Sequence, residues 1–221
     1  MNHFVFSAVL TFLTSGFISA YFVLKKSKNA RLFGIYWLSI SFWSFTVGFQ
    51  QLLLKVLPDY LWGWFLHFGC IFIPIIFLHF AVRYTQSNLN KLLFFGYIIT
   101  VSYVLLNTFT KLFTYTIAYR DLYAYPKPAF LYPVYFLTFV SMIVIGSLLL
   151  LLFMKNRDRI KNKTAFVIFL IAHSMAYLGA MDNFLIMADI KIFPLYPFGL
   201  YLAVSYAVVS GLTYDCFTPE E

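Results

Sequence analysis

The chain has 221 residues, of which 62% are hydrophobic and only 11% are charged. A soluble domain averages about 45–50% apolar and about 25% charged residues, so a water-soluble fold could not hide this much apolar surface. The formal net charge is +8. The basic residues lie in short segments between apolar runs, which is the pattern that orients membrane proteins, and we expect no nucleic-acid partner.

Seven stretches are long and apolar enough to cross a bilayer, since a spanning helix needs about 20 apolar residues. In chain order the predicted spans are 4–24, 32–54, 60–82, 92 to about 107, 131–154, 165–187 and 196–214. The segment 114–130 is rich in Tyr and Pro and is predicted as the longest loop. The composition therefore predicts an all-α membrane protein with seven transmembrane helices.

The basic residues are divided unequally between the two sets of alternate loops. Eleven lie in the loops that follow the first, third and fifth spans, and five lie on the opposite side. Because Lys and Arg concentrate on the cytoplasmic side, the larger set predicts an external amino terminus and a cytoplasmic carboxyl terminus. We expect a multi-pass protein of the cell (inner or cytoplasmic) membrane, in contact with lipid.

Polar residues within the apolar runs are candidates for function, because they are costly in lipid. Asp182 is the one acid inside a predicted span, and it either pairs with a basic group such as Lys111 or Lys191 or faces a watery pocket. His67 either binds a ligand or is a neutral histidine bonded to a neighbouring helix. If a pocket exists, we expect the loop 115–132 to cover it. The candidate ligand-binding residues are Trp62, Trp64, His67, Asp182 and Asn183.

Motifs for catalysis are absent from the sequence. The last span has no Lys for a retinal Schiff base, and no hydrolase, metalloprotease or phosphate-loop motif is present. Cys70 lies in an apolar run and Cys216 near the tail, which argues against a disulfide or a cysteine metal site. We therefore predict no enzymatic activity, no cofactor and no metal for this chain.

Two stretches resemble a known membrane sensor family. Residues 29–85 and 179–215 carry the motif positions, which are Phe42-Trp43, Gly48, Gly69, Pro74, Phe77, Phe80, Tyr84-Thr85, Gly179, Asn183-Phe184, Pro194, Pro197, Gly199, Tyr206-Ala207 and Asp215. This pattern is similar to the N-terminal seven-transmembrane region of histidine kinases. The family's exit segment usually carries Arg between the Tyr-Ala pair and the Asp, whereas this chain has Ser210, Gly211 and Leu212 there.

The resemblance implies a bacterial sensor of the two-component type, with a sensor domain at 1–215 and a tail or the start of a signalling helix at 216–221. It implies an unknown small or hydrophobic ligand, and an output domain on a cytoplasmic segment or a partner protein; a homodimer stays open. The candidate coupling residues are His79 and Arg83, which share a helix face, and Tyr206 and Asp215. A small transporter or permease and a scaffold subunit without a ligand are the alternatives.

Overall fold

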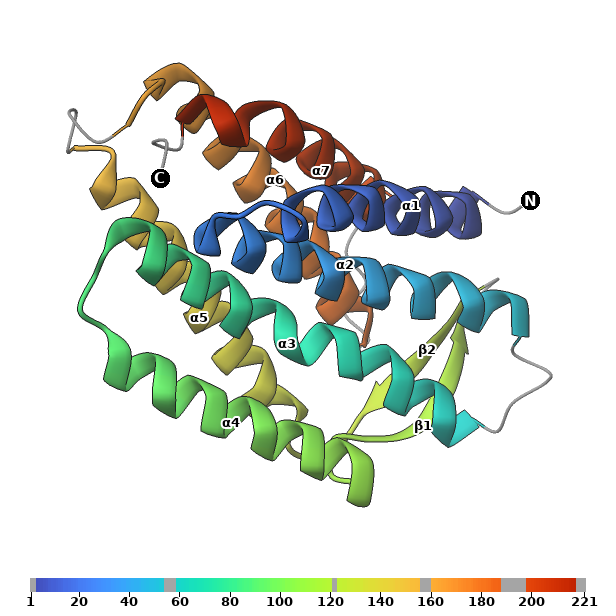
Figure 1. Cartoon of the computed structure of the whole chain (residues 1–221). Coiled ribbons are helices and arrows are strands. Elements are labelled where there is room, and N and C mark those ends of the chain that lie inside the picture. Colours follow the sequence, from blue (N-terminus) through green and yellow to red (C-terminus); the bar gives the residue numbers. More distant parts are fainter. Residues whose placement is uncertain (1–2, 54–58, 121–122, 156–159, 188–197, 218–221) are drawn as a thin grey trace.

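The computed structural model describes residues 3–53, 59–120, 123–155, 160–187 and 198–217. These residues form a helical bundle in which successive helices run in opposite directions, so α1 begins at one end and α7 ends at the other (Figure 1). The elements are α1 (His3–Val23), α2 (Lys28–Leu53), α3 (Asp59–Thr85), α4 (Asn90–Phe109), β1 (Thr114–Arg120), β2 (Tyr123–Pro128), α5 (Tyr132–Phe153), α6 (Lys163–Met187) and α7 (Phe198–Phe217).

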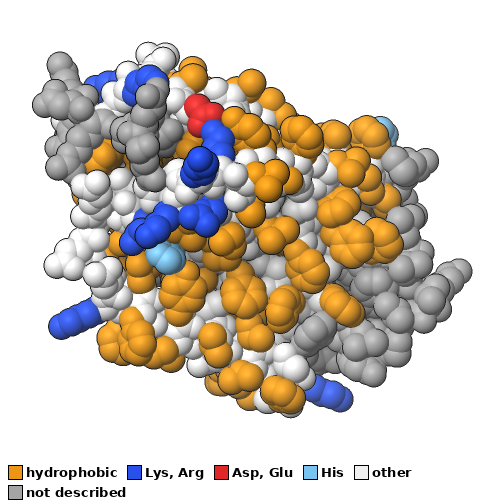
Figure 2. All heavy atoms as spheres, viewed as in Figure 1, with side chains coloured by type: hydrophobic (Ala, Val, Ile, Leu, Met, Phe, Trp, Pro, Cys, Tyr) orange, Lys and Arg blue, Asp and Glu red, His pale blue; other side chains and the backbone are white. Residues whose placement is uncertain are grey.

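Six of the helices in the described residues, α1 to α6, are long and apolar enough to cross a membrane. Large apolar side chains point away from the bundle, among them Phe94, Phe95 and Leu178, which are 60–71% exposed. Figure 2 shows such side chains covering one face, with Lys and Arg gathered mainly at one end. Because the outer surface is apolar, lipid rather than water suits it as a solvent.

Small residues bring α1 close to α2. Ser19 on α1 donates a hydrogen bond to the carbonyl of Gly34 over 2.9 Å, and Ser41 on α2 donates to the carbonyl of Phe12 over 3.1 Å. Helices in lipid associate through close backbone approach and interhelical hydrogen bonds of this kind, because lipid tails provide no hydrophobic drive.

The segment predicted as a long loop is a β-hairpin. Strands β1 and β2 pair antiparallel, with Ile117 opposite Pro126 and Tyr119 opposite Ala124. The hairpin packs against α3 and also touches α2 and α6 at one end of the bundle (Figure 1). Its sequence, Thr-Tyr-Thr-Ile-Ala-Tyr-Arg followed by Tyr-Ala-Tyr-Pro-Lys-Pro, is rich in β-branched and aromatic residues that favour strands. The prolines are tolerated because a two-stranded ribbon has a free edge on each strand.

Helix α3 lies between α2 on one side and α4 and α5 on the other, and it contains Pro74 in its interior. A Cβ atom on Gly69 would lie 2.8 Å from the backbone nitrogen of Trp43 on α2. A Cβ atom on Gly146 of α5 would lie 2.7 Å from the ring of Phe77. These glycines allow the neighbouring helices to approach α3 closely, so that the rings of α3 reach the middle of the bundle.

Candidate functional site

Aromatic rings from four helices fill the middle of the bundle. The ring of Phe77 on α3 stacks on His173 of α6 at 4.3 Å between centroids. Trp37 on α2 lies 4.8 Å from Tyr206 on α7. All four side chains are almost fully buried. The other rings of this central cluster are Phe33, Tyr36, Phe80, Phe169, Tyr177 and Tyr214.

A chain of polar groups crosses this central cluster from α5 to α7. The Ser147 hydroxyl lies 3.0 Å from Nε2 of His173, and Nδ1 of His173 lies 3.1 Å from the Tyr206 hydroxyl. Ser147 donates its proton to the carbonyl of Ile143 over 2.8 Å. A hydroxyl has one proton, so Ser147 bonded to Ile143 accepts from Nε2 of His173, and a neutral His173 then accepts from Tyr206 at Nδ1. In this arrangement a neutral His173 has its proton on Nε2.

A second buried contact connects α2 with α6. The hydroxyls of Tyr36 and Tyr177 lie 2.9 Å apart. The Tyr36 and Tyr206 rings are 6.4 Å apart in an edge-to-face arrangement. Polar links therefore join α2, α5, α6 and α7 at one level of the bundle. Sequence reasoning did not place His173, Tyr177 or Ser147 among the candidates, although a histidine in an apolar run is a signal that could have pointed to this level.

The ligand candidate His67 lies in a separate aromatic enclosure near the hairpin. It is 1% exposed, and its ring makes edge-to-face contacts with Phe113 at 5.3 Å and with Tyr132 at 5.6 Å. The hydroxyl of Tyr135 donates to the sulfur of Cys70 over 3.3 Å. His67 is thus enclosed by aromatic rings beneath the hairpin end rather than lying on an open surface.

The other four ligand candidates lie on helices that reach this enclosure. Trp62 and Trp64 belong to the first turns of α3, and Asp182 and Asn183 to the last turns of α6, but their side chains lie outside the described residues. The neighbouring Phe184 packs 4.9 Å from Phe136 and 5.1 Å from Phe139 on α5, so this end of α6 borders the enclosure. The prediction that these four side chains gather around His67 stays a prediction.

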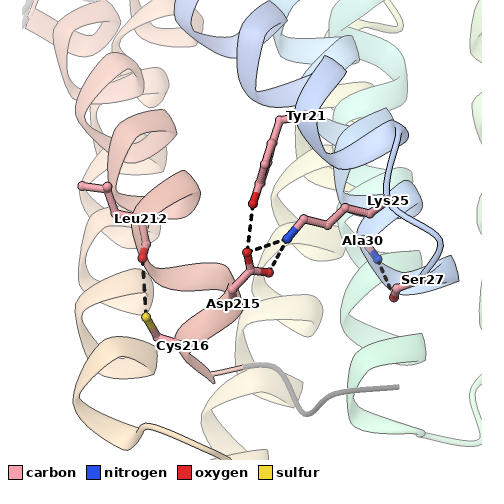
Figure 3. Close-up of polar contacts among 7 residues, drawn as sticks. All are labelled: Tyr21, Lys25, Ser27, Ala30, Leu212, Asp215 and Cys216. Carbon is pink, nitrogen blue, oxygen red and sulfur yellow. Dashed lines mark hydrogen bonds and ion pairs between the residues drawn. The ribbon is translucent and has the colours of Figure 1, made fainter.

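At the opposite end of the bundle, Asp215 joins the last turn of α7 to the end of α1. Figure 3 shows its carboxylate facing Lys25 and Tyr21. Lys25 forms an ion pair with Asp215, and the Tyr21 hydroxyl donates to the same carboxylate over 3.0 Å. Burial lowers the pKa of Lys25, but the hydrogen bonds to Asp215 and Tyr21 and the carboxylate charge outweigh burial, so this pKa is raised above its ordinary value. Sequence reasoning named Asp215 as a coupling candidate but not its partners, which are Tyr21 on α1 and Lys25 just past its end.

The two remaining coupling candidates lie between α3 and α4. Nδ1 of His79 is 2.7 Å from the hydroxyl of Tyr97 on α4, and Arg83 is exposed one turn further along α3. Sequence reasoning placed His79 and Arg83 on one helix face but did not identify Tyr97 as the partner.

Several motif residues that suggested a sensor family occupy specific positions in this arrangement, whereas Pro194 and Pro197 lie outside the described residues. Phe77, Phe80 and Tyr84 project from α3 into the core, and Gly179 and Gly199 bring α6 and α7 into backbone contact. A comparison with protein families matches residues 6–218 to the N-terminal 7TM region of histidine kinase. The chain belongs to this family. No curated protein and no solved structure matches the chain.

Membership of the histidine kinase 7TM family confirms the resemblance seen in the sequence. It identifies a multi-pass membrane protein and a sensor module of signal transduction, a region that is distinct from the catalytic part of a histidine kinase. The ring and hydroxyl contacts between α2, α3, α5, α6 and α7 are therefore contacts within a sensor module.

Proposed function

We propose that the chain is a seven-span sensor of the cytoplasmic membrane, with its amino terminus outside and the end of α7 inside. The observation that carries this proposal is the family match over residues 6–218. The unequal distribution of basic residues and the alternating helix directions (Figure 1) support the orientation. α7 is counted as the seventh span, since it runs alongside α1 and α6. The output is a cytoplasmic signalling domain on the same polypeptide or on a partner.

The ligand region of this proposal is the hairpin end, around His67. The enclosure of Phe113, Tyr132 and Tyr135 is apolar and aromatic, which suits a small or hydrophobic ligand. Trp62, Trp64, Asp182 and Asn183 would complete the site, and the hairpin would act as its cover. A ligand shifts the sensor only if it binds two helix arrangements with different affinity. Movement of the hairpin away from α3 is one change that would give access to His67.

Contiguous aromatic packing connects the ligand region with α7. Tyr135 packs on Phe139 at 6.0 Å, Phe139 on Tyr177 at 6.4 Å, and Tyr177 on His173 at 4.7 Å. His173 is hydrogen-bonded to Tyr206 on α7. A displacement of α5 or α6 at the hairpin end would therefore disturb α7 through groups in direct contact. Tyr206 and Asp215 would carry the shift along α7, and His79 with Arg83 would couple α3 to α4.

The test joins the chain after Glu221 to the dimerisation and kinase region of a histidine kinase and measures autophosphorylation in membrane vesicles. His173→Gln and Phe77→Leu alter the central cluster with modest volume changes, and each should change basal autophosphorylation severalfold without added ligand. Phe94→Leu, on the lipid-facing side of α4, is the matched control and should leave it unchanged. Unaltered autophosphorylation in folded His173→Gln and Phe77→Leu proteins would contradict the proposal, and solute flux in proteoliposomes would favour a transporter.

A further inference from the structure

His79 lies at the edge between α3 and α4, and within the described residues only one of its two ring nitrogens has a hydrogen-bond partner. Nδ1 of His79 is 2.7 Å from the Tyr97 hydroxyl, and the two rings meet edge-to-face at 5.7 Å. Nε2 of His79 has no hydrogen-bond partner in the described part of the chain. The side chain is half-buried. If Tyr97 donates to Nδ1, or if the ring is protonated, Nε2 carries a proton that it can donate to a ligand.

Arg83 supplies a full positive charge beside this histidine. It lies four residues further along the same face of α3, about 6 Å along the helix axis, and is exposed in the last turn. No Asp or Glu occurs in the sequence between residues 60 and 120, so neither α3 past Asp59 nor α4 offers Arg83 an acidic partner. Among the described residues Arg83 forms no ion pair. Its guanidinium is thus available to an external anion.

The surroundings of this pair combine positive charge with an apolar surface. The pairing of His79 with Tyr97 sets the antiparallel register of α3 and α4, which places the exposed Lys91 near the level of Thr85. Along α4, the exposed side chains of Phe94, Phe95 and Ile98 form an apolar surface. Figure 2 shows basic side chains and a histidine where the apolar face meets one end of the molecule. A molecule that fits both parts has an anionic head and hydrocarbon tails.

We propose that His79 and Arg83 bind the phosphate of an anionic phospholipid, whose acyl chains lie on the exposed surface of α4. The guanidinium pairs with two phosphate oxygens in its fork geometry, and Nε2–H of His79 donates to a phosphate oxygen one turn deeper. Tyr97 positions the imidazole for this contact. Lys91 adds charge at the rim, as basic groups between membrane helices do for acidic headgroups. The site depends only on the membrane location of the chain and not on its sensor role.

The experiment places the full chain in nanodiscs that contain equal amounts of phosphatidylglycerol and phosphatidylcholine. Native mass spectrometry then measures which lipid stays bound after release from the disc. The wild-type chain should retain phosphatidylglycerol preferentially. Arg83→Gln and His79→Gln should each reduce this preference about tenfold, the effect of losing one charge-assisted contact. Tyr97→Phe should reduce it less, because the imidazole stays but loses its fixed orientation.

Lys155→Gln is the matched control, because it removes an exposed basic residue from the same end of the bundle without touching α3 or α4. It should keep the wild-type preference. An equal loss in Lys155→Gln would show diffuse attraction to acidic lipid and would overturn the proposed site, as would an unchanged preference in Arg83→Gln and His79→Gln. Inorganic phosphate should not displace the bound phosphatidylglycerol; displacement would overturn the assignment to a lipid. Circular dichroism of each variant checks that the bundle is folded.

Discussion

Gly179 on α6 and Gly199 on α7 bring the two helix backbones into direct contact. A Cβ atom on Gly199 would lie 2.5 Å from the carbonyl oxygen of Gly179, and a Cβ atom on Gly179 would lie 2.9 Å from the Cα atom of Gly199. Because the obstructing atoms belong to backbone, no side-chain rotation relieves either clash. The crossing of α6 and α7 therefore requires glycine at both positions, and it brings α7 close enough for Tyr206 to reach His173.

Replacement of Gly199 by alanine should force α7 away from α6. Alanine favours a helix by about 1 kcal/mol over glycine, but overpacking at a close contact costs about 1–3 kcal/mol, so we expect a net loss of stability. Thermal unfolding in detergent measures it. Gly211→Ala is the matched control on the same helix, because its Cβ would meet only the movable side chain of Ile18. Equal melting temperatures for the Gly199→Ala and wild-type proteins would contradict the backbone contact.

The hydrogen bond between Tyr206 and His173 gives a second prediction. Tyr206→Phe keeps the ring but removes the proton that Nδ1 of His173 accepts, leaving a buried acceptor without its partner. The expected loss of unfolding free energy is about 1–2 kcal/mol, the range of interhelical hydrogen bonds in membranes. Tyr201→Phe on the same helix is the control, since its hydroxyl has no hydrogen-bond partner in the described residues. If both variants unfold at the wild-type temperature, the polar link does not stabilise the bundle.

The tautomer of His173 is a third prediction, and it is open to direct measurement. The bonds of Ser147 place the proton of a neutral His173 on Nε2. Nitrogen-15 spectra of the labelled protein in lipid should therefore show a protonated Nε2 and an unprotonated Nδ1 at neutral pH. Ser147→Ala should shift the Nε2 signal more than the Nδ1 signal, because only Nε2 loses its acceptor. A proton found on Nδ1 would contradict the order of donors and acceptors along this chain of groups.

The contact between Lys25 and Asp215 should matter more for signalling than for stability. An exposed ion pair contributes about 0–1 kcal/mol, so Asp215→Asn should hardly change the unfolding temperature. In a kinase fusion the same variant should change autophosphorylation, because it frees the last turn of α7 from α1. The double exchange Lys25→Asp with Asp215→Lys restores opposite charges and should recover the wild-type level. Cys216→Ser, next to Asp215, is the control; an effect as large as that of Asp215→Asn would point to general damage.

The same ion pair sets a pH dependence with a definite sign. The pKa of Lys25 is raised in the folded chain, so its contribution to stability is complete below its unfolded value, about 10.4. That contribution is lost as the pH rises through the higher folded pKa. The small stability difference between wild type and Lys25→Gln should therefore be constant from neutral pH to about pH 10 and should vanish above that range.

Sequence patterns predicted the helices well but not the contacts between them. The apolar runs predicted the seven helices of the described residues to within a few residues, because a run of about 20 apolar residues is typical of a spanning helix. The segment 114–130 was expected as a loop, since prolines at 126 and 128 concealed the strand-forming residues of the hairpin. Proline is compatible with the open edge of a two-stranded ribbon, so the inference from proline to loop was wrong here.

The candidate residues show the same contrast, because the sequence indicated some of the residues but not the partners that they contact. Asp215 and Tyr206 were predicted from motif positions, and each makes a specific contact with another helix. Their partners Lys25, Tyr21 and His173 were not predicted, because nothing in a linear sequence states which helices are neighbours. Ser147 is one of many serines in apolar runs, and only the packing of α5 against α6 distinguishes it. Pairwise contacts between distant segments depend on the helix arrangement, which composition and periodicity do not determine.

The orientation of the chain in the membrane is the last prediction. The sequence places eleven Lys and Arg residues in the loops predicted after the first, third and fifth spans, and five on the opposite side. Reporter fusions after Lys163 should therefore be active as cytoplasmic reporters, and fusions after Lys127 in the hairpin should be active as external ones. A chain with the basic residues 155, 161 and 163 changed to Gln should show weaker discrimination, because these charges hold the α5–α6 loop inside. The reverse pattern in the unchanged chain would place the His67 enclosure on the cytoplasmic side, and the proposal of an external ligand would then be wrong.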